Sequence, residues 1–515
     1  MKLMPVVVVD IGTTNIKTGI FNEEGRLLHL FLERVNLEVD NTGKAEQNPY
    51  EIYSKVITSL RQASRVLSGE AEAIFFTSQM HSAMLLDKNG EPLSGLITYL
   101  DTRPSLIIDE IDLRDYELYR ETGCPPLIVY PLPKIIYLRR IIKPRSQHKV
   151  AVSVKEFPLL RLTGQLVVDA STASGAQMVN IRNLKWSERA MELAQVTEEN
   201  LPELLIGEKD HLELTSDAAS LTGFRKGTPV YPGVSDAGAH SFGVLALDPD
   251  KLALNVGTSA AIRVTKPEPQ VDKYEMRFFS YYAGNSRWII GGAINNAGIA
   301  VEWFLRSFAA AEEIVSDTAR IDKFALLDVE AQLSPPGANH LIFLPYLTGE
   351  RFPVRDPFFR GAFYGASLST TRNDILRAIM EGVAFTLKMI YNALRENGLN
   401  PSIIHGGGGG LRMKTWRQIF SDVFGMPLYV VREEAEPTLI GGWLHFSLAT
   451  GRIGYKEAAG MHGEILQRGS TPDPLVNEFY SEYFQLYTKL YKVLKDYSRE
   501  FHQFIRTRGE LPLTC

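Results

Sequence analysis

A carboxylate stands beside a glycine and two hydroxyl side chains near the start of the chain. The stretch VVVVDIGTTNIKTGIF reads as a strand that ends at Asp10, followed by a tight turn with Gly12, Thr13 and Thr14. The amides and hydroxyls of this turn could bind phosphate, which the carboxylate of Asp10 would repel. A Mg²⁺ ion between them removes the conflict, because Mg²⁺ usually binds one or two carboxylates together with phosphate oxygens. The alternative is that Asp10 only caps the turn.

The stretch LALNVGTSAAIRVT, which begins at Leu252, repeats this pattern in the second half of the chain. Both stretches contain an apolar strand, a short polar residue, a glycine, two hydroxyls and a second strand. Matched at the glycine, the two copies pair Asp10 with Asn255, Gly12 with Gly257, Thr13 with Thr258 and Thr14 with Ser259. Chance could produce so short a match, but each copy opens a region of domain size, which favours structural duplication. Two similar domains would form a cleft, where ligands usually bind.

Three other segments carry residues suited to ligand binding or catalysis. Asp236 in GVSDAGAHS precedes a predicted helix, where it could be the N-cap or a general base for a substrate hydroxyl. His81 in SQMHS follows a predicted strand, although a lone histidine usually has only a structural role. The glycine run at residues 406–410 lies between a predicted strand and a predicted helix, which favours close approach of a flat ligand over a flexible loop.

The common nucleotide-binding motifs do not fit the sequence. No GxxxxGK[ST] is present, and Lys44, which follows a glycine, is itself followed by alanine. The glycine run has Leu411 where the third glycine of GxGxxG would fall. A P-loop NTPase and a dinucleotide dehydrogenase are therefore both disfavoured.

Composition indicates an ordinary globular protein, with 45% hydrophobic and 22% charged residues. The net charge of -5 gives no electrostatic footprint for nucleic acid or for an anionic membrane. The two cysteines, Cys124 and Cys515, form neither a disulfide framework nor a metal site, and we expect packing or surface roles for them. No apolar run is long enough for a signal peptide or a membrane span, so we expect a cytoplasmic protein.

The elements that must position these residues follow from apolar periodicity and turn signals. Three antiparallel strands are expected before a first helix, and a buried strand is expected after it. The strands fall at residues 6–10, 16–21, 27–39 and 72–79, and the helices at residues 50–67, 375–394, 414–424 and 477–497. A chain of 515 residues favours two domains, with a boundary near residues 231–247.

These segments together resemble the FGGY carbohydrate kinases of the actin, Hsp70 and sugar-kinase superfamily. The likeness covers nearly the whole chain, from DIGTTNIKTGIF through SQMHSAMLLDKNGEPLSGLITYLDTRP, SVKEFPLLRLTGQLVVDASTASG and LPYLTGERFPVRDP to GGGGGLRMKTWRQIFSDVFGMPL. The most specific match is GAFYGASLSTTRNDILRAIMEG, which follows the family's second signature except at Ala366. The first signature is looser, because VYPLPKIIYLRR has Tyr137 where the family prefers tryptophan. The resemblance implies an α/β fold with two ribonuclease H-like domains, residues 1–240 and 241–515, on either side of a cleft.

The resemblance also implies roles for individual residues. Asp10 looks like the Mg²⁺-associated aspartate and Asp236 like the catalytic base. The segments that contact the sugar contain Met80, His81, Arg103, Asp236 and Asn296. The ATP site is expected to include Gly12, Thr13, Thr14, Lys17, Gly257, Thr258, Ser259, Gly408, Gly409, Gly410 and Gly441, with residues 439–442 as part of the adenosine pocket. Met413 departs from the serine usual after the glycine run.

The implied activity is ATP-dependent phosphorylation of a terminal hydroxyl of a small sugar or sugar acid. MHS, in place of the MHG typical of xylulose kinases, and GGAINNAGI are similar to gluconate kinases, although Ala297 replaces a usual glycine. Gluconate, converted to 6-phosphogluconate, is therefore the favoured substrate, with xylulose or another ketopentose as the alternative and glycerol last. The implied partners are the sugar and ATP, with no nucleic acid and no membrane, and a homodimer stays open.

Two functions of a different class remain open at this stage. An ATP-driven chaperone or filament protein of the same superfamily would share Asp10 and the paired glycine turns, but would need neither Asp236 nor a segment such as SQMHS. A catalytically silent sugar-binding regulator is disfavoured because both aspartates are present and no additional DNA-binding segment is visible.

Overall fold

The computed structural model describes residues 4–508 except 111–114, 144–146, 208, 310–317, 319, 321, 357 and 433–434. The chain divides into two compact units, each built from several stretches. Unit 1 comprises Met1–Asp248, Thr265–Ile290 and Arg432–Ile465, and unit 2 comprises Pro249–Val264, Gly291–Val431 and Leu466–Cys515. Among the described residues, no helix has the length and apolar character needed to cross a bilayer. Cys124 is buried in unit 1, and Cys515 lies outside the described residues.

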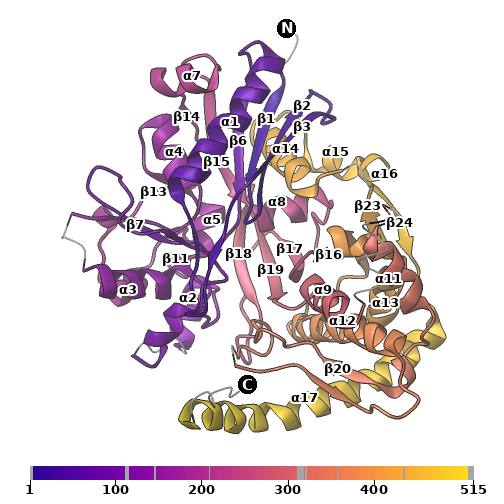
Figure 1. Ribbon diagram of the computed structural model, residues 1–515. Coiled ribbons are helices and arrows are strands. Elements are labelled where there is room, and N and C mark those ends of the chain that lie inside the picture. The colour runs from indigo at the N-terminus through magenta and orange to yellow at the C-terminus, as the bar shows by residue number, and fades with distance from the viewer. Residues whose placement is uncertain are drawn as a thin grey trace. The chain divides into compact units, whose positions relative to one another are not determined.

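In the described part of unit 1, six strands form a mixed sheet (Figure 1). Their order is β14 (Leu212–Glu213), β15 (Pro229–Ser235), β6 (Ala73–Ser78), β1 (Val6–Ile11), β2 (Asn15–Phe21) and β3 (Leu27–Arg34). β1, β2 and β3 are antiparallel neighbours, which confirms the three strands predicted before the first helix. The third is shorter than predicted, because the chain leaves the sheet after Arg34. β15, β6 and β1 run parallel, so their carboxyl ends reach one edge of the sheet.

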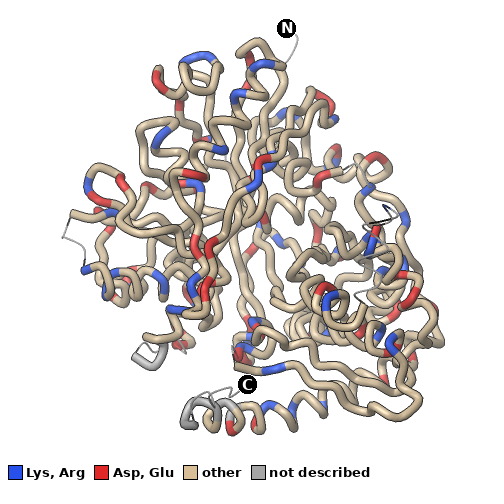
Figure 2. Tube along the Cα trace, viewed as in Figure 1, with Lys and Arg blue, Asp and Glu red and all other residues tan. Residues whose placement is uncertain are grey.

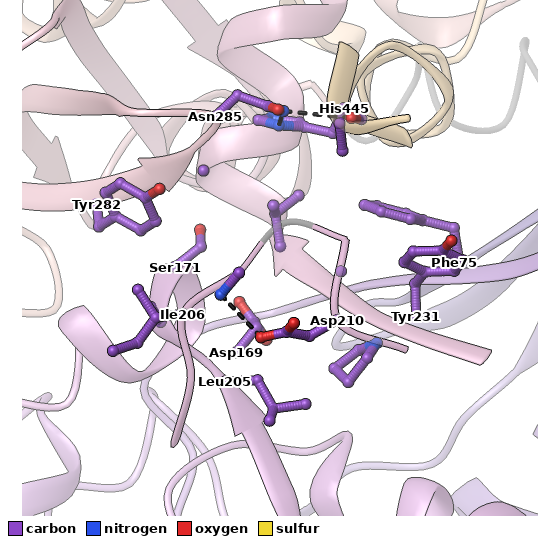
Figure 3. Close-up of a pocket in the computed structure, with 17 residues that line it drawn as sticks. Phe75, Asp169, Ser171, Leu205, Ile206, Asp210, Tyr231, Tyr282, Asn285 and His445 are labelled. Atoms are coloured by element: carbon purple, nitrogen blue, oxygen red, sulfur yellow. Dashed lines mark hydrogen bonds between the residues drawn. The ribbon is translucent and has the colours of Figure 1, made fainter. Parts of the chain in front are cut away.

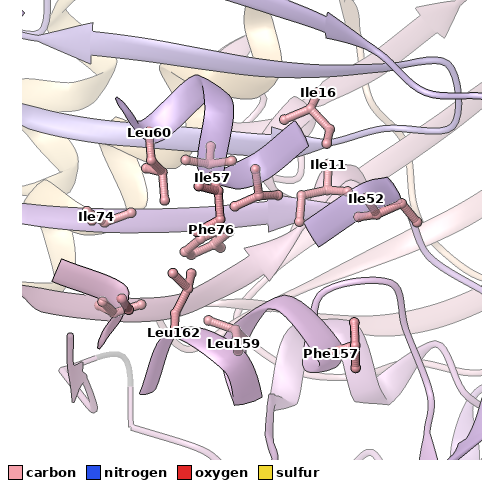
Figure 4. Packing of buried hydrophobic residues seen from close by; sticks show 14 of the residues in the cluster. Ile11, Ile16, Ile52, Ile57, Leu60, Ile74, Phe76, Phe157, Leu159 and Leu162 are labelled. Carbon is pink, nitrogen blue, oxygen red and sulfur yellow. The ribbon is translucent and has the colours of Figure 1, made fainter. Parts of the chain in front are cut away.

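Helix α1 (Pro49–Leu67) anchors this sheet to the core of unit 1. Its N-cap is Asn48, whose side chain accepts hydrogen bonds from the backbone amides of the second and third helical residues. The first helical residue is proline, which is common at that position. Its buried face carries Ile52, Ile57 and Leu60, which belong to the same apolar cluster as Phe76 of β6 (Figure 4). Each such side chain stabilises the fold by about 1.5–3 kcal/mol when fully buried. This packing fixes the strands that carry the candidate site.

Unit 2 repeats the strand arrangement of unit 1. Its sheet contains, in order, β17 (Ala260–Lys266), β16 (Lys251–Val256), β22 (Ile403–Gly407), β23 (Leu428–Val431) and β24 (Leu466–Ser470). β16 pairs antiparallel with β17 and parallel with β22, β22 pairs parallel with β23, and β23 pairs antiparallel with β24. The strands β2, β1, β6, β15 and β14 of unit 1 have the same order and directions. The predicted duplication is confirmed by this shared topology.

The helices predicted in the second half of the chain are confirmed as parts of unit 2. They are α12 (Arg372–Glu396), α13 (Lys414–Phe424) and α17 (Pro474–Arg508), accompanied by α9 (Gly298–Phe308) and α11 (Lys323–Gln332). α12 begins with a capping box formed by Thr371 and Asp374. β22 ends inside the glycine run, at Gly407, and α13 follows the run, as the sequence predicts.

The two matched turns differ in length by one residue. The β1–β2 turn spans four residues between the paired Ile11 and Ile16, and Gly12 N donates to Asn15 O at 3.0 Å. The β16–β17 turn spans three residues between Val256 and Ala260. The pairing of residues between the two copies therefore holds up to the two hydroxyl residues. After them, the second strands are shifted by one position relative to each other.

Charged residues of both signs are interspersed along the described chain (Figure 2). Several of them are buried in unit 1, and four of these lie on or contact the elements that carry the candidate site. Lys134 and Lys155 are 0% exposed, and Asp10 and Asp169 are 7% and 6% exposed. Because a buried charge is costly unless it is paired or hydrogen-bonded, the contacts of these groups identify constrained positions.

Candidate active site

Asp10 lies within β1, one residue before the strand ends. Its Oδ1 accepts a hydrogen bond from Thr77 Oγ1 of β6 at 2.8 Å. Among the described residues, the turn makes no hydrogen bond to this carboxylate, so the interpretation of Asp10 as a turn cap is wrong. Burial raises the pKa of Asp10, and the Thr77 hydrogen bond and the charge of Lys17 oppose this rise. A cation beside the carboxylate would stabilise its charged form.

Lys17, which lies opposite Asp10 on β2, forms an ion pair with an acidic partner. Its Nζ lies 2.5 Å from Oε2 of Glu436, the residue that precedes helix α14 (Pro437–Ala449). Both side chains are about one third exposed, and ion pairs at such positions contribute on the order of 0–1 kcal/mol. A nucleotide phosphate could therefore replace Glu436 at small cost, and phosphate binding by Lys17 stays a prediction.

Asp236 is the first residue of helix α8 (Asp236–Gly243) and follows β15 directly. The N-cap of the helix is Ser235, whose Oγ accepts from Gly238 N at 3.1 Å. The interpretation of Asp236 as the N-cap is therefore wrong by one residue. Ser235 pairs in register with Ser78, the last residue of β6. Asp236 and the loop that contains His81 thus leave adjacent parallel strands at the same edge of the sheet, the position where ligands bind in many α/β proteins.

His81 adopts a left-handed backbone conformation, with φ of 67°, which is strained for a residue with a side chain. Its ring Nδ1 lies 2.9 Å from Gly175 O, and its carbonyl accepts from the buried ammonium of Lys134. The rings of Tyr130 and Tyr281 pack edge-to-face with the imidazole, at centroid distances of 5.1 and 5.8 Å. Such strain persists only where the surroundings hold it, and it occurs often at functional sites. His81 is therefore a rigid group at the carboxyl edge of the sheet.

Met80 and Arg103, the other residues expected near the sugar, are also held by unit 1. Met80 is 5% exposed, and its Cε lies 2.1 Å from where a Cβ at Gly175 would stand. The guanidinium of Arg103 donates to the carboxylates of Asp101 and Glu46 at 2.5–3.1 Å. These contacts orient the two side chains, and their contacts with a sugar stay predictions.

The second glycine turn is supported by the start of helix α9. Gly298 N donates to Gly257 O at 2.9 Å, and Ile299 N donates to Thr258 O at 3.1 Å. A Cβ at Gly298 would lie 2.5 Å from Gly257 O. This glycine therefore permits the close approach that connects the helix to the turn.

Asn296, just before α9, is fully buried and uses both ends of its amide within unit 2. Nδ2 donates to Gly349 O at 2.7 Å and to Glu350 Oε2 at 3.1 Å, and Oδ1 accepts from Thr348 N at 3.1 Å. Burial raises the pKa of Glu350 to about 7 despite these hydrogen bonds. Asn296 therefore holds residues 348–350 against the turn before α9, and its predicted contact with the sugar stays untested.

The three glycines predicted to bind adenosine after β22 have different surroundings. Gly408 has φ of 102°, and a Cβ there would lie 2.5 Å from Val256 O. A Cβ at Gly410 would lie 2.5 Å from the side chain of Val256. At Gly409, no described heavy atom beyond its chain neighbours lies within 4 Å of that position. Gly408 and Gly410 are thus required by packing on β16, and Gly409 has open space beside it.

Gly441, which belongs to the segment 439–442 of the predicted adenosine pocket, lies in the packing of α14 against α8. A Cβ at Gly441 would stand 1.7 Å from Ala239 O, and one at Gly243 would stand 1.7 Å from Pro437 O. The two helices approach closely because each has a glycine at the contact.

The substitutions Gly441→Ala and Gly409→Ala are expected to affect different properties, the first stability and the second the KM for ATP. Gly441→Ala inserts a methyl group between α8 and α14 and should cost about 1–3 kcal/mol of stability, with the KM for ATP nearly unchanged. Gly409→Ala, the matched control, should leave the melting temperature unchanged and raise the KM for ATP. Thermal unfolding and steady-state kinetics of both variants test this. A weakened ATP affinity with a normal melting temperature in Gly441→Ala would contradict the packing role.

Sequence reasoning missed the buried ion pair behind Asp236. Lys155 Nζ lies 2.5 Å from Asp169 Oδ2, and Lys155 also donates to two carbonyls of β15. Asp169 and Ser171 line a cavity of about 30 Å³ whose opposite wall contains Tyr231 (Figure 3). The available signal was a lone lysine beside Glu156 in the otherwise apolar stretch SVKEFPLL.

The chain matches two family models that together cover most of its length. Residues 5–243 match the N-terminal domain of the FGGY family of carbohydrate kinases, and residues 252–448 match its C-terminal domain. A gluconokinase of Bacillus subtilis (strain 168) is 34% identical over 450 residues, which cover 86% of this chain and 87% of the relative. A xylulose kinase of Staphylococcus xylosus is 26% identical over 437 residues, which cover 84% of this chain and 88% of the relative.

Solved structures of similar proteins have the same fold. A gluconate kinase from Lactobacillus acidophilus superposes with a TM-score of 0.86 at 27% identity, covering 96% of this chain and all of that one. A xylulose kinase from the same organism gives a TM-score of 0.87 at 28% identity, covering 97% of this chain and all of that one. With both halves of the duplicated fold matched by the family's two domain models, the chain belongs to the FGGY family of carbohydrate kinases.

Proposed function

We propose that this kinase transfers the γ-phosphoryl group of ATP to a terminal hydroxyl of gluconate, giving 6-phosphogluconate. The observation that carries the proposal is the common edge of the unit 1 sheet, where β1, β6 and β15 deliver Asp10, His81 and Asp236. The similarity to a relative named gluconokinase supports the choice of substrate.

In the proposed reaction, Asp236 is the general base. Its carboxylate accepts the proton of the substrate hydroxyl while the hydroxyl oxygen bonds to the γ-phosphorus of ATP. The bond from that phosphorus to the bridging oxygen breaks, and ADP leaves with the electron pair. Because Ser235 caps α8, the carboxylate of Asp236 is not required to cap the helix.

The first glycine turn is proposed to bind phosphates of ATP, with Asp10 holding a Mg²⁺ ion that accompanies the nucleotide. The residues fit this ion. Asp10 is a buried carboxylate that accepts one hydrogen bond from a neutral hydroxyl and lies opposite one lysine. Among the described residues, no three His, Cys, Asp or Glu side chains form a metal-binding group, which suits an ion bound mainly through phosphates and water. When bound, Mg²⁺ would neutralise charge on the transferring phosphoryl group.

A ketopentose such as xylulose is the second candidate substrate, because xylulose kinases are also among the similar proteins. Ser82 bears on the choice, since it stands where xylulose kinases typically have glycine. Its side chain is 0% exposed, and its hydroxyl has no hydrogen-bond partner among the described residues. This residue directly follows His81, which is proposed to contact the sugar, and this supports our choice of gluconate.

A coupled ADP-release assay with gluconate, xylulose, ribulose, erythritol and glycerol tests the proposal. Gluconate is expected to give the highest kcat/KM by at least about tenfold, the discrimination that a single altered contact commonly provides. Oxidation of the product by 6-phosphogluconate dehydrogenase would identify it. Preference for xylulose would favour the second candidate, and no stimulation by any of the five would contradict a kinase acting on small sugars or sugar acids.

A further inference from the structure

The strand that delivers Asp236 is irregular just before it ends. The parallel pairing of β15 with β6 shifts register between Tyr231 and Val234. Gly233 lies in this bulge with φ of 75°, and a Cβ there would stand 1.8 Å from Phe76 O. A bulge interrupts the ladder of hydrogen bonds and leaves backbone groups that need other partners.

Lys155 supplies these partners from the start of helix α4 (Glu156–Thr163). Its ammonium donates to Pro232 O at 2.8 Å and to Val234 O at 3.0 Å, one on each side of Gly233. Its remaining face meets the carboxylate of Asp169 at 2.5 Å as an ion pair. An ammonium has three protons and no acceptor. The two carbonyls therefore use two of its donors, and the contact with Asp169 is an ion pair without hydrogen-bond geometry. The side chain is fully buried, so water does not compete with them.

Ser235, the residue after Val234 in the strand, is held by a neighbouring helix. Helix α5 (Ala170–Ser174) begins at Asp169, whose side chain accepts from Thr172 N at 2.8 Å. Ser171 Oγ of this helix accepts from Ser235 N at 3.1 Å and lies 3.0 Å from Ser235 Oγ. Asp169 and Ser171 both line the cavity drawn in Figure 3. The backbone on the N-terminal side of Asp236 is thus held at three points, Pro232 O, Val234 O and Ser235 N.

We propose that Lys155, paired with Asp169, is a positioning residue for Asp236. Its two bonds to the bulge set the direction in which β15 enters α8, and this direction places the carboxylate of Asp236 against the acceptor hydroxyl. The inference rests on the proposed role of Asp236 as the general base. A pair that served stability alone could be replaced by apolar side chains, since buried ion pairs often add little net stability. The contacts with carbonyls cannot be replaced in that way.

The first test is Lys155→Met, assayed well below its melting temperature. We expect kcat to fall about 100-fold, the effect of a misplacement of roughly 1 Å, while the KM for ATP and sugar changes less than about threefold. Arg377→Met is the matched control, because Arg377 and Glu381 form a similarly buried ion pair in unit 2, 9% and 2% exposed. It should lower the melting temperature comparably and leave kcat near normal. A kcat for Lys155→Met within about threefold of the parent would overturn the inference.

The double variant Lys155→Met with Asp169→Asn separates positioning from charge balance. It removes the unpaired carboxylate and retains a side chain able to cap α5, so the melting temperature should recover while kcat stays low. Recovery of kcat together with stability would show that the pair only balances charge. It also supplies a folded protein if the single variant does not fold.

Chemical rescue gives a second readout. In Lys155→Ala, ethylammonium is expected to raise kcat at least about fivefold by occupying the vacated site, while tetramethylammonium at equal ionic strength, which cannot donate hydrogen bonds, should not. Equal stimulation by both ions would contradict positioning by hydrogen bonds. The two proposals fail separately. An active Asp236→Asn enzyme contradicts the general base, whereas an inactive Asp236→Asn with a fully active Lys155→Met contradicts only the present inference.

Discussion

Replacing Asp236 with asparagine is expected to lower kcat by about 100- to 10,000-fold, the usual contribution of a positioned general base. The amide has nearly the shape of the carboxylate but cannot accept the proton of the substrate hydroxyl. Since Ser235 caps α8, the start of the helix should persist in the variant. Loss of the favourable charge at the first helical position should cost only about 0.3–1 kcal/mol.

Single-turnover and steady-state kinetics with the preferred sugar measure this effect, and calorimetric titration with ADP measures nucleotide binding. The dissociation constant for ADP should remain within about twofold of the parent value, because the base acts on the acceptor and not on the nucleotide. Asp217→Asn is the control, since Asp217 lies exposed in the first turn of α7 (Ser216–Thr222) in the same unit. It should have normal turnover. Near-normal turnover of Asp236→Asn would contradict the base assignment.

The duplicated sheet was predictable because its signal is local. Each copy contains two strands joined by a glycine turn, and hydrophobic alternation with turn residues reports such hairpins directly. The strand order that the hairpins share involves the partners β6 and β22, which lie far along the chain. The paired motifs suggest that the two sheets share a strand order, but they do not say which later strands pair with the hairpins. The one-residue difference in turn length was not predicted, because it depends on which backbone carbonyl closes each turn.

The candidate residues were easier to predict than the contacts that hold them. Asp236 was found because an aspartate between small residues stands out, but its separation from the N-cap depends on where β15 ends. The β15 bulge sets that end, and Lys155 stabilises it from 77 and 79 positions away in sequence. No periodicity reports so distant a side-chain contact. For Gly441 the prediction of a ligand contact was ambiguous, because a glycine is suited both to the close approach of a ligand and to the close packing of two helices.

The two copies of the hairpin differ in their charged residues, and this difference bears on which copy would hold the metal ion. The position of Asp10 in the first hairpin is occupied by Asn255 in the second, and Lys17, the cross-strand neighbour of Asp10, corresponds to Ala261. The second turn therefore has neither charged group. We infer that a divalent ion would be held by the first turn alone, with the second turn binding phosphate through amides and hydroxyls.

The second large effect is therefore expected from Asp10→Asn. The amide oxygen can still accept the hydrogen bond of Thr77, but the charge that would hold Mg²⁺ is lost. At a fixed millimolar concentration of Mg²⁺, kcat should fall about 100- to 1,000-fold, since charge stabilisation by a metal ion contributes several kcal/mol and each 1.36 kcal/mol is tenfold in rate. Activity measured against Mg²⁺ concentration should saturate at higher concentrations than in the parent. An unchanged Mg²⁺ dependence would contradict the assignment of Asp10.

Stability distinguishes this loss of activity from misfolding. Burial raises the pKa of Asp10 above its ordinary value of 3.8, so the folded protein binds the proton more tightly than the unfolded chain. The free energy of unfolding in the absence of metal must then decrease as pH rises from that value through the folded-state pKa, and ionised Asp10 destabilises the protein at neutral pH. Asn cannot ionise, so the variant should lose this part of the pH dependence and melt at the same or a higher temperature at pH 7. A variant that loses both activity and thermal stability at pH 7 would show instead that the carboxylate of Asp10 supports the fold.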